Sequence, residues 1–203
     1  MGAMKAEGGK AVDESSVREE KHLLRQSIAR KRAALSAAYQ RAASNQIAEA
    51  FLRSSFYQSA KSLFVYIGVA GEPDTKRIIE QAWADGKNVF VPLCHGKGMM
   101  DAVAIQSWND LVPGRLGIPE PKENKASLSP ALDLAVVPCV CASRDGRRLG
   151  HGAGYYDRFF SAHPMKTVCL CFEQLITGDI PIDSLDQPMD AVLTEAGWFF
   201  GKK

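Results

Sequence analysis

The sequence predicts an α/β protein with a three-layer, Rossmann-like fold, in which helices cover a largely parallel sheet and two helices precede it. Two observations predict this class. Short apolar segments alternate with amphipathic ones along most of the chain, and a glycine-rich turn joins the most apolar segment to a helical one. Continuous apolar strands separated by helices are typical of parallel sheets that are covered on both faces.

Two helices are expected at the start of the chain. Between Glu19 and Ser54 apolar residues recur at helical spacing, and the pattern breaks near Ser36. Residues 1–20 are rich in glycine, serine and charge, so we expect a disordered tail or a cloning remnant there. The remainder, residues 21–203, is expected to form a single domain.

The rest of the chain alternates between strand and helix patterns. Runs of apolar residues that are too short for a helix predict strands, and runs with a 3.6-residue period predict helices. In chain order, the expected elements are strand Leu63–Ile67, helix Thr75–Ala84, strand Asn88–Pro92, a short strand Ala102–Gln106, a turn Gly117–Pro121, strand Leu132–Cys139, helix Tyr155–Ala162, and strands Thr167–Phe172 and Ala191–Thr194.

Composition excludes several classes of protein. A chain of 203 residues with 46% hydrophobic content can bury a core without cross-links. Its formal net charge of +2 argues against nucleic acid as the main partner. No apolar run approaches the roughly 20 residues that cross a bilayer. Five cysteines, an odd number, argue against a disulfide framework and for a reducing compartment. We therefore expect a cytoplasmic, monomeric protein that binds neither nucleic acid nor membranes.

Two cysteine pairs could in principle bind zinc, namely Cys139 with Cys141 and Cys169 with Cys171. Both pairs lie in apolar runs that resemble strands, where residues two apart share one face. In zinc sites, the paired cysteines are more often separated by two residues and lie on turns, whereas one residue separates them here. We therefore expect buried thiols at these positions, and neither a metal site nor a nucleophile.

The most informative segment runs from Arg148 to Arg158 and reads RLGHGAGYYDR. Its alternating glycines can adopt unusual backbone angles and direct peptide N–H groups at an anion, and the helix expected after them would point its positive end at the same place. The two arginines could bind phosphate oxygens, and Asp157 could hold a magnesium ion. A plain strand-to-helix turn is the alternative. The spacing matches neither the dinucleotide fingerprint nor the Walker loop.

A second loop is expected to face the glycine-rich one. In open α/β sheets, ligands bind beyond the carboxyl ends of the strands, so the loop after Leu63–Ile67 should open at the same edge. Glu72 and Asp74 would then face a common cleft. Asp74 could equally cap the helix that follows it.

Lys21 and Arg25 are four residues apart, so a helix would present both on one face and could grip one polyphosphate. An ordinary solvated basic face is the alternative, because this region also contains Arg18 and the run Arg30–Arg32. Those neighbouring basic residues are given no role.

The glycine-rich segment resembles the signature of the 5-formyltetrahydrofolate cyclo-ligase family, whose members are also called 5,10-methenyltetrahydrofolate synthetases. Three further segments agree with that family in the same order, namely Lys21–Arg25, Gly117–Pro121 and Met189–Glu195. The resemblance extends from about Lys21 to Trp198. His151 and Ala153 stand where relatives often have other residues.

The resemblance implies roles for individual residues. Arg148, Tyr155 and Asp157 would act in catalysis, and Asp157 with Asp190 would hold Mg²⁺. ATP would be bound by Lys21, Arg25, Arg148, Leu149, Gly150, His151, Gly152, Ala153, Gly154, Tyr155 and Tyr156. The folate would be bound by Ile67, Glu72, His151, Gly152, Ala153, Gly154 and Tyr155.

The reaction implied by the resemblance uses ATP as co-substrate and Mg²⁺ as cofactor. ATP would phosphorylate the formyl oxygen on N5 of 5-formyltetrahydrofolate, with or without a polyglutamate tail. N10 would then attack the activated carbon, and loss of phosphate would give 5,10-methenyltetrahydrofolate. No protein nucleophile is needed, since positioning and charge stabilisation suffice.

Three alternatives belong to other functional classes. A regulator of the same fold would bind folate or nucleotide without turnover. A related enzyme acting on sugar phosphates or coenzyme A esters would use the glycine-rich loop but would not need Asp157 and Asp190. RNA binding through the basic first helix is the weakest, because no aromatic stacking platform accompanies that helix in the sequence.

Overall fold

A seven-stranded sheet forms the centre of the molecule. The computed structural model describes residues 14–69, 71–96, 98–114, 117–122 and 132–201. The strands of the sheet are β1 (Ser62–Val65), β2 (Asn88–Gly96), β3 (Met99–Ile105), β6 (Leu134–Val137), β9 (Lys166–Leu170), β10 (Ala191–Thr194) and β11 (Gly197–Phe200). Their order is β11-β10-β9-β6-β1-β2-β3. The inner strands run parallel, and the edge strands β3 and β11 are antiparallel to their neighbours. The predicted fold class is confirmed.

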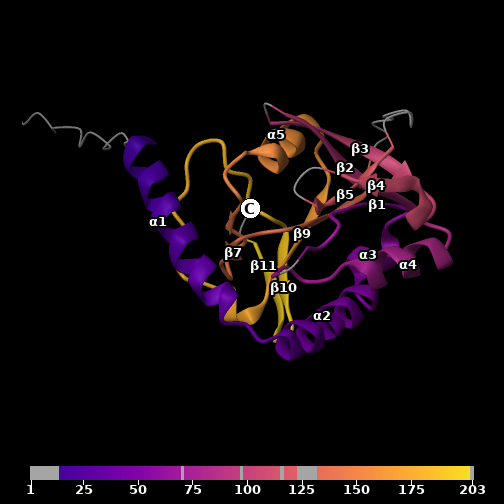
Figure 1. Ribbon diagram of the computed structural model, residues 1–203, viewed down its shortest axis with the longest axis horizontal. Helices are drawn as coiled ribbons and strands as arrows, with labels where there is room; N and C mark the ends of the chain where they lie inside the picture. Colours follow the sequence, from indigo (N-terminus) through magenta and orange to yellow (C-terminus); the bar gives the residue numbers. More distant parts are fainter. Residues whose placement is uncertain (1–13, 70, 97, 115–116, 123–131, 202–203) are drawn as a thin grey trace, which may run out of the picture.

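Helices cover both faces of this sheet (Figure 1). On one side lie α2 (Ala37–Leu52), α3 (Ser55–Ser59) and α4 (Lys76–Ala84), and on the other lies α5 (Tyr155–Ala162). The long helix α1 (Glu14–Ala33) runs along the flank of the molecule. Two leading helices and a three-layer arrangement therefore match the prediction.

The remaining elements are short. One small sheet pairs β4 (Leu111–Pro113) with β5 (Pro119–Pro121), and another pairs β7 (Cys141–Ala142) with β8 (Arg148–Leu149). Single 3₁₀ turns occur at Trp108–Asp110 and Glu173–Leu175. The β7–β8 hairpin matters most for function, because it connects the end of β6 to the glycine-rich loop.

The inner strands are apolar because both of their faces are covered. Every residue of β1, β6 and β10 is buried. On the α5 side, the ring of Phe64 in β1 packs against Phe159 and Tyr156 of the helix, with ring centroids 4.8 and 6.1 Å apart. This packing fixes α5, and with it the end of the loop that leads into the helix.

The first helix begins earlier than the sequence pattern predicts. α1 starts at Glu14, so residues 14–20 are helical and the boundary expected at residue 20 is too late. The reason is that Val17 is buried and falls on the same stripe as Lys21 and Ile28, which are buried as well. Residues 1–13 of the expected tail lie outside the described residues.

Other element boundaries differ for physical reasons. The strand expected to end at Pro92 continues to Gly96, because beyond Phe90 it pairs only with β3, and such a one-sided position tolerates a proline. The short strand expected at residues 102–106 is part of the longer β3. Neither β11 nor α3 was predicted.

Four of the five cysteines are buried, as expected, and none forms a disulfide. The thiols of Cys139, Cys169 and Cys171 cluster between β6 and β9, where the Cys139 Sγ lies 3.5 Å from the carbonyl oxygen of Leu170. Burial raises the pKa of Cys141 to about 12. In the part of the chain that the structure describes, no three histidine, cysteine or acidic side chains are grouped to hold a metal ion.

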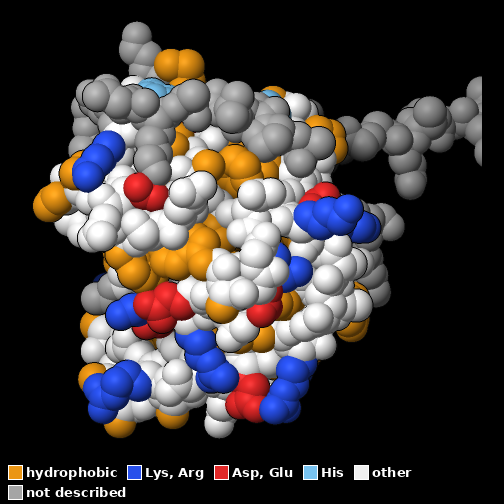
Figure 2. Space-filling view, turned by 90° about the vertical axis from the view of Figure 1, so that its right-hand side faces the viewer, with side chains coloured by type: hydrophobic (Ala, Val, Ile, Leu, Met, Phe, Trp, Pro, Cys, Tyr) orange, Lys and Arg blue, Asp and Glu red, His pale blue; other side chains and the backbone are white. Residues whose placement is uncertain are grey.

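Charges of both signs are mixed over the surface. On the face seen in Figure 2, lysine and arginine side chains alternate with acidic ones and form no continuous basic field. No described helix has both the length and the apolar character required to cross a bilayer.

Candidate functional site

The glycine-rich loop forms where the chain leaves the carboxyl edge of the parallel sheet. After β6, the β7–β8 hairpin brings the chain to Arg148, and α5 starts at Tyr155. Gly152 has a φ of 100° and Gly154 a φ of 67°, both in the left-handed region that favours glycine. Gly154 is also the N-cap of α5. The loop therefore needs glycine at two of its three alternating positions.

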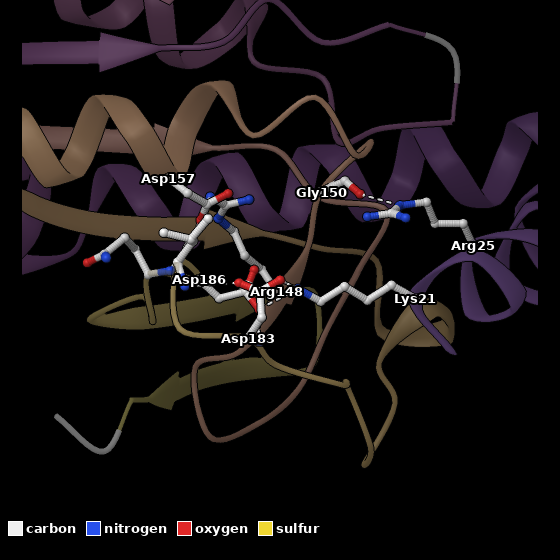
Figure 3. Close-up of polar contacts among 9 residues, drawn as sticks. Lys21, Arg25, Arg148, Gly150, Asp157, Asp183 and Asp186 are labelled. Atoms are coloured by element: carbon white, nitrogen blue, oxygen red, sulfur yellow. Dashed lines mark hydrogen bonds and ion pairs between the residues drawn. The ribbon is translucent and has the colours of Figure 1, made fainter. Parts of the chain in front are cut away.

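Arg148 and Asp157 form an ion pair in the interior of the site (Figure 3). The Nη2 of Arg148 lies 2.7 Å from the Oδ1 of Asp157, and the backbone N–H of Gln187 donates to the same oxygen over 3.2 Å. The Arg148 side chain is only 3% exposed. Its Nε is buried and has no hydrogen-bond partner among the described residues. A buried guanidinium with an unused donor is suited to an anionic oxygen.

Helix α1 presents two cations to this region, as the spacing predicts. The Nε of Arg25 donates to the carbonyl oxygen of Gly150 over 2.8 Å. A Cβ at Gly152 would lie 3.4 Å from the Cζ of Arg25, so the guanidinium packs along the loop. Figure 3 shows Lys21 and Arg25 reaching from α1 toward Arg148 and Gly150.

Lys21 contacts a pair of carboxylates rather than the glycine loop. Its Nζ lies 2.7 Å from the Oδ2 of Asp183 and 2.5 Å from that of Asp186. The hydrogen bond from Lys21 holds the pKa of Asp183 below its usual value. These two acids belong to the loop between β9 and β10, which thereby docks on α1. No role is predicted for these two acids from the sequence, because an Asp-x-x-Asp pattern in a loop is not specific to any contact.

Arg158 links the glycine loop to another part of the chain. Its Nε donates to the carbonyl oxygen of Gly98 over 3.1 Å, and its Nη2 donates to that of Ala153. The side chain thus ties the glycine loop to the β2–β3 hairpin, and the expectation that it binds phosphate stays a prediction.

The loop after β1 meets the glycine loop, as the topology predicts. The Nε2 of His151 lies 3.1 Å from the Oε1 of Glu72, whose side chain is only 7% exposed. The backbone N–H of Val69 approaches the other oxygen of Glu72 at 3.4 Å. Ile67, which follows β1, is half-buried beside the same loop. Both sets of expected folate contacts thus lie at one edge of the sheet.

The segment before α4 has a structural role of its own. Asp74 accepts a hydrogen bond from the Lys76 N–H over 2.9 Å, which supports the start of the helix. The N-cap itself is Thr75, whose Oγ1 donates to the carbonyl of Tyr66 over 2.6 Å and accepts from the N–H of Gly68 over 3.2 Å. Asp74 therefore supports the start of the helix from the residue before the N-cap, and the cap position expected for it belongs to Thr75.

Not every residue of the signature offers its side chain to a ligand. Leu149 is buried in the core, and its carbonyl oxygen accepts from the Val140 N–H over 2.7 Å. Tyr156 packs on Phe64 and Phe160, and burial raises the pKa of its hydroxyl well above the usual value. Tyr155 is half-buried at the first position of α5. Leu149 could therefore contact a ligand only through its backbone, whereas the side chain of Tyr156 is half-buried.

The two acids expected to hold magnesium have different surroundings. The Oδ2 of Asp190 accepts from the backbone N–H and the hydroxyl of Thr167, over 2.8 and 2.9 Å, and its Oδ1 lies 3.5 Å from the Lys166 Nζ. These contacts place it at the amino ends of β9 and β10. Asp157, in the first turn of α5, accepts both of its described hydrogen bonds on Oδ1. A carboxylate with one oxygen unused by described donors fits Mg²⁺, which takes one or two carboxylates together with phosphate oxygens.

The fold and this arrangement define an α/β protein with a glycine-rich loop at the carboxyl edge of its sheet. Comparison with known sequences identifies the family within this class. The sequence model of the 5-formyltetrahydrofolate cyclo-ligase family matches residues 17–195, and the chain belongs to this family. It is therefore an enzyme of the ligase class.

Individual relatives agree over most of their length. The chain is 40% identical to a probable 5-formyltetrahydrofolate cyclo-ligase of Caenorhabditis elegans, over 72% of this chain and 79% of the relative. It is 30% identical to the 5-formyltetrahydrofolate cyclo-ligase of Escherichia coli K12, over 82% of this chain and 96% of the relative. The solved structure of Aquifex aeolicus 5,10-methenyltetrahydrofolate synthetase superposes with a TM-score of 0.80 at 26% identity, over 90% of this chain and 93% of that one.

Proposed function

We infer that the protein catalyses the ATP- and Mg²⁺-dependent cyclisation of 5-formyltetrahydrofolate to 5,10-methenyltetrahydrofolate, with release of ADP and phosphate. The observation that carries this inference is the buried Arg148 guanidinium, which faces a glycine loop and keeps one donor unused. Family membership supports the same cyclisation. The assignment of individual residues rests on the contacts described above.

The nucleotide half of the site is assigned to the glycine loop and α1. Arg148 and Arg25 supply the charge nearest the loop, and the backbone from Gly150 to Tyr156 supplies N–H donors at the start of α5. Lys21 is engaged by Asp183 and Asp186, so a polyphosphate must share or replace these carboxylates to reach its Nζ. We expect nucleotide binding to loosen the Asp183–Asp186 loop from α1.

The folate half is assigned to the loop after β1 and to His151–Tyr155. The carboxylate of Glu72 is nearly buried and contacts His151. It can accept hydrogen bonds from N–H groups of a pterin ring if His151 moves aside or if both donate to the same carboxylate. Ile67 supplies an apolar contact beside it. His151 thus lies where both ligands would meet.

Asp157 is the residue best suited to hold magnesium, because its Oδ2 accepts no described hydrogen bond and its carboxylate lies beside the arginine assigned to the phosphates. A bound Mg²⁺ would offset the charge of the phosphate oxygens during transfer. Asp190 remains a predicted second ligand, although its described contacts tie it to Thr167.

The reaction needs no nucleophile from the protein. The formyl oxygen on N5 attacks the γ-phosphorus of ATP, and ADP leaves. N10 then adds to the activated carbon, which closes the five-membered ring. Loss of phosphate and of the N10 proton then gives 5,10-methenyltetrahydrofolate. Arg148 and the loop N–H groups orient the phosphates and stabilise developing charge, while Glu72 and Tyr155 orient the folate. Burial of the Arg148 side chain strengthens this electrostatic contribution.

The remaining expectations are part of this proposal. We expect the enzyme to act in the cytoplasm, because its buried free thiols suit a reducing compartment. We also expect it to be a monomer. We expect the protein to bind neither nucleic acid nor membranes. We expect it to accept the folate with or without a polyglutamate tail.

The proposal is tested by mixing the purified protein with 5-formyltetrahydrofolate and Mg-ATP and following the near-ultraviolet absorbance of the methenyl product together with ADP. One ADP for each product molecule supports the cyclo-ligase. Folate binding without product, or product without ADP, would instead support a non-catalytic regulator or a different reaction.

A further inference from the structure

The last turn of α1 carries an arginine that points into the molecule. The Nη2 of Arg32 donates to the carbonyl oxygens of Cys139 and Val140, over 2.9 and 3.1 Å. Both acceptor residues are buried, and they belong to the stretch where the chain leaves β6 for the β7–β8 hairpin. Buried carbonyl groups at the end of a strand need a donor, and Arg32 supplies it to two of them.

The stem of the same side chain meets the loop after β1. A Cβ placed on Gly71 would lie 2.6 Å from the Cδ of Arg32 and 2.9 Å from its Cγ. Gly71 also has a φ of 85°, so glycine is required there for both conformation and space. The next residue along the chain is Glu72, the acid assigned to the folate.

Arg32 therefore contacts both segments that lead into the site, the end of β6 through its guanidinium and the Glu72 loop through its stem. Its Nε is buried without a partner among the described residues, and an unpaired buried donor costs free energy. The side chain is therefore not an ordinary surface charge. Its neighbour Arg30 is exposed.

We propose that Arg32 is a positioning residue that sets the distance between the glycine loop and the Glu72 loop, and hence between nucleotide and folate. The contact joins α1, the end of β6 and Gly71 in one junction. Activity as the readout rests on the proposed function, whereas the junction itself does not. Loss of Arg32 should misplace the two loops relative to one another, and misplacement of reacting groups by about 1 Å costs on the order of a hundredfold in rate.

The experiment compares Arg32→Ala, Arg32→Lys and Gly71→Ala with the exposed control Arg30→Ala. In each full-length protein, amide hydrogen exchange is followed around Gly71 and Val140, and kcat and KM are measured for both substrates. In Arg32→Ala we expect roughly tenfold faster exchange in both segments and a fall in kcat/KM of roughly tenfold to a hundredfold. Millimolar guanidinium should restore part of the activity of Arg32→Ala. The kcat/KM of Arg32→Lys should lie between those of the parent protein and Arg32→Ala.

Gly71→Ala should reproduce the Arg32 phenotype, and the double variant should be little worse than either single one, because both act through one contact. Exchange and kcat/KM in Arg32→Ala that match Arg30→Ala would overturn the proposal. A uniform loss of stability, without a selective effect at the two segments and without guanidinium rescue, would overturn it as well. If the parent protein shows no turnover, the proposed function fails, while the exchange experiment still decides whether Arg32 joins the loops.

Discussion

At the scale of single residues, the site depends on side chains whose charge is matched inside the protein before any ligand arrives. Arg148 is nearly inaccessible and is neutralised by Asp157, while Lys21 is held by two acids. Such pairs preorganise a site, because the cations are already fixed when a polyphosphate binds. Arg158 differs from both, because the partners of its guanidinium are two backbone carbonyl oxygens and no carboxylate is among its described contacts.

Asp157→Asn tests the most important of these charges. The change keeps the size of the side chain and removes its negative charge, so we expect the Mg²⁺ concentration for half-maximal activity to rise by roughly tenfold or more, and kcat to fall. Activity is measured against free Mg²⁺ at saturating ATP. The exposed Asp179 supplies the control Asp179→Asn. An unchanged Mg²⁺ dependence in Asp157→Asn would remove this carboxylate from the metal site.

At the scale of elements, the inner strands and α5 could be predicted because short apolar runs and helical periodicity in the local sequence indicate which residues are buried. The helix Tyr155–Ala162 was found with its observed bounds, since Gly154 precedes it and His163-Pro164 follows. By contrast, β11 is a four-residue edge strand near the end of the chain, and α3 has only five residues, so neither carries enough periodicity.

The docking of α1 could not be predicted from the sequence either. Its partners Asp183 and Asp186 lie more than 160 residues away along the chain, and Arg32 reaches carbonyl groups, which no sequence pattern can reveal. Helical spacing correctly put Lys21 and Arg25 on one face, but it could not show that an acid pair already holds the lysine.

Replacing Lys21 tests how α1 is held. The pKa of Asp183 is lowered in the folded protein, so its carboxylate stabilises the fold above its unfolded pKa, and this contribution is lost as the pH falls through the folded value. We expect Lys21→Met to reduce the free energy of unfolding by about 1–2 kcal/mol at pH 7, where partial exposure weakens the pair. The deficit should shrink below about pH 4.

Urea unfolding at a series of pH values measures this difference, with the exposed Lys31→Met as the control variant. A deficit that is the same at pH 3 and pH 7 would mean that Lys21 stabilises the helix by packing of its stem and not through its charge.

At the scale of the whole molecule, one parallel sheet organises both the core and the site. Its buried centre contains four cysteines, and its carboxyl edge carries the two loops that meet at Glu72 and His151. The general location of the site followed from topology, because loops after parallel strands open at a common edge. The detailed contacts did not, since they depend on how side chains pack.

Thiol labelling tests the packing of this core. In the native protein we expect at most one maleimide equivalent to react readily, at the half-buried Cys94, and five to react in denaturant. Burial raises the pKa of the Cys94 thiol, so its labelling should accelerate as the pH is raised above 7. Cys94→Ser should abolish native labelling. Two or more rapidly labelled native thiols would contradict the described core.

The central claim is that ATP phosphorylates the formyl oxygen within this site. The most direct measurement uses 5-formyltetrahydrofolate labelled with ¹⁸O in the formyl group and follows the label by mass spectrometry during turnover with Mg-ATP. If ATP phosphorylates the formyl oxygen, the ¹⁸O appears in the released inorganic phosphate, one atom for each methenyl product. Release of the label into water, with phosphate that carries only ATP-derived and solvent oxygen, would contradict it.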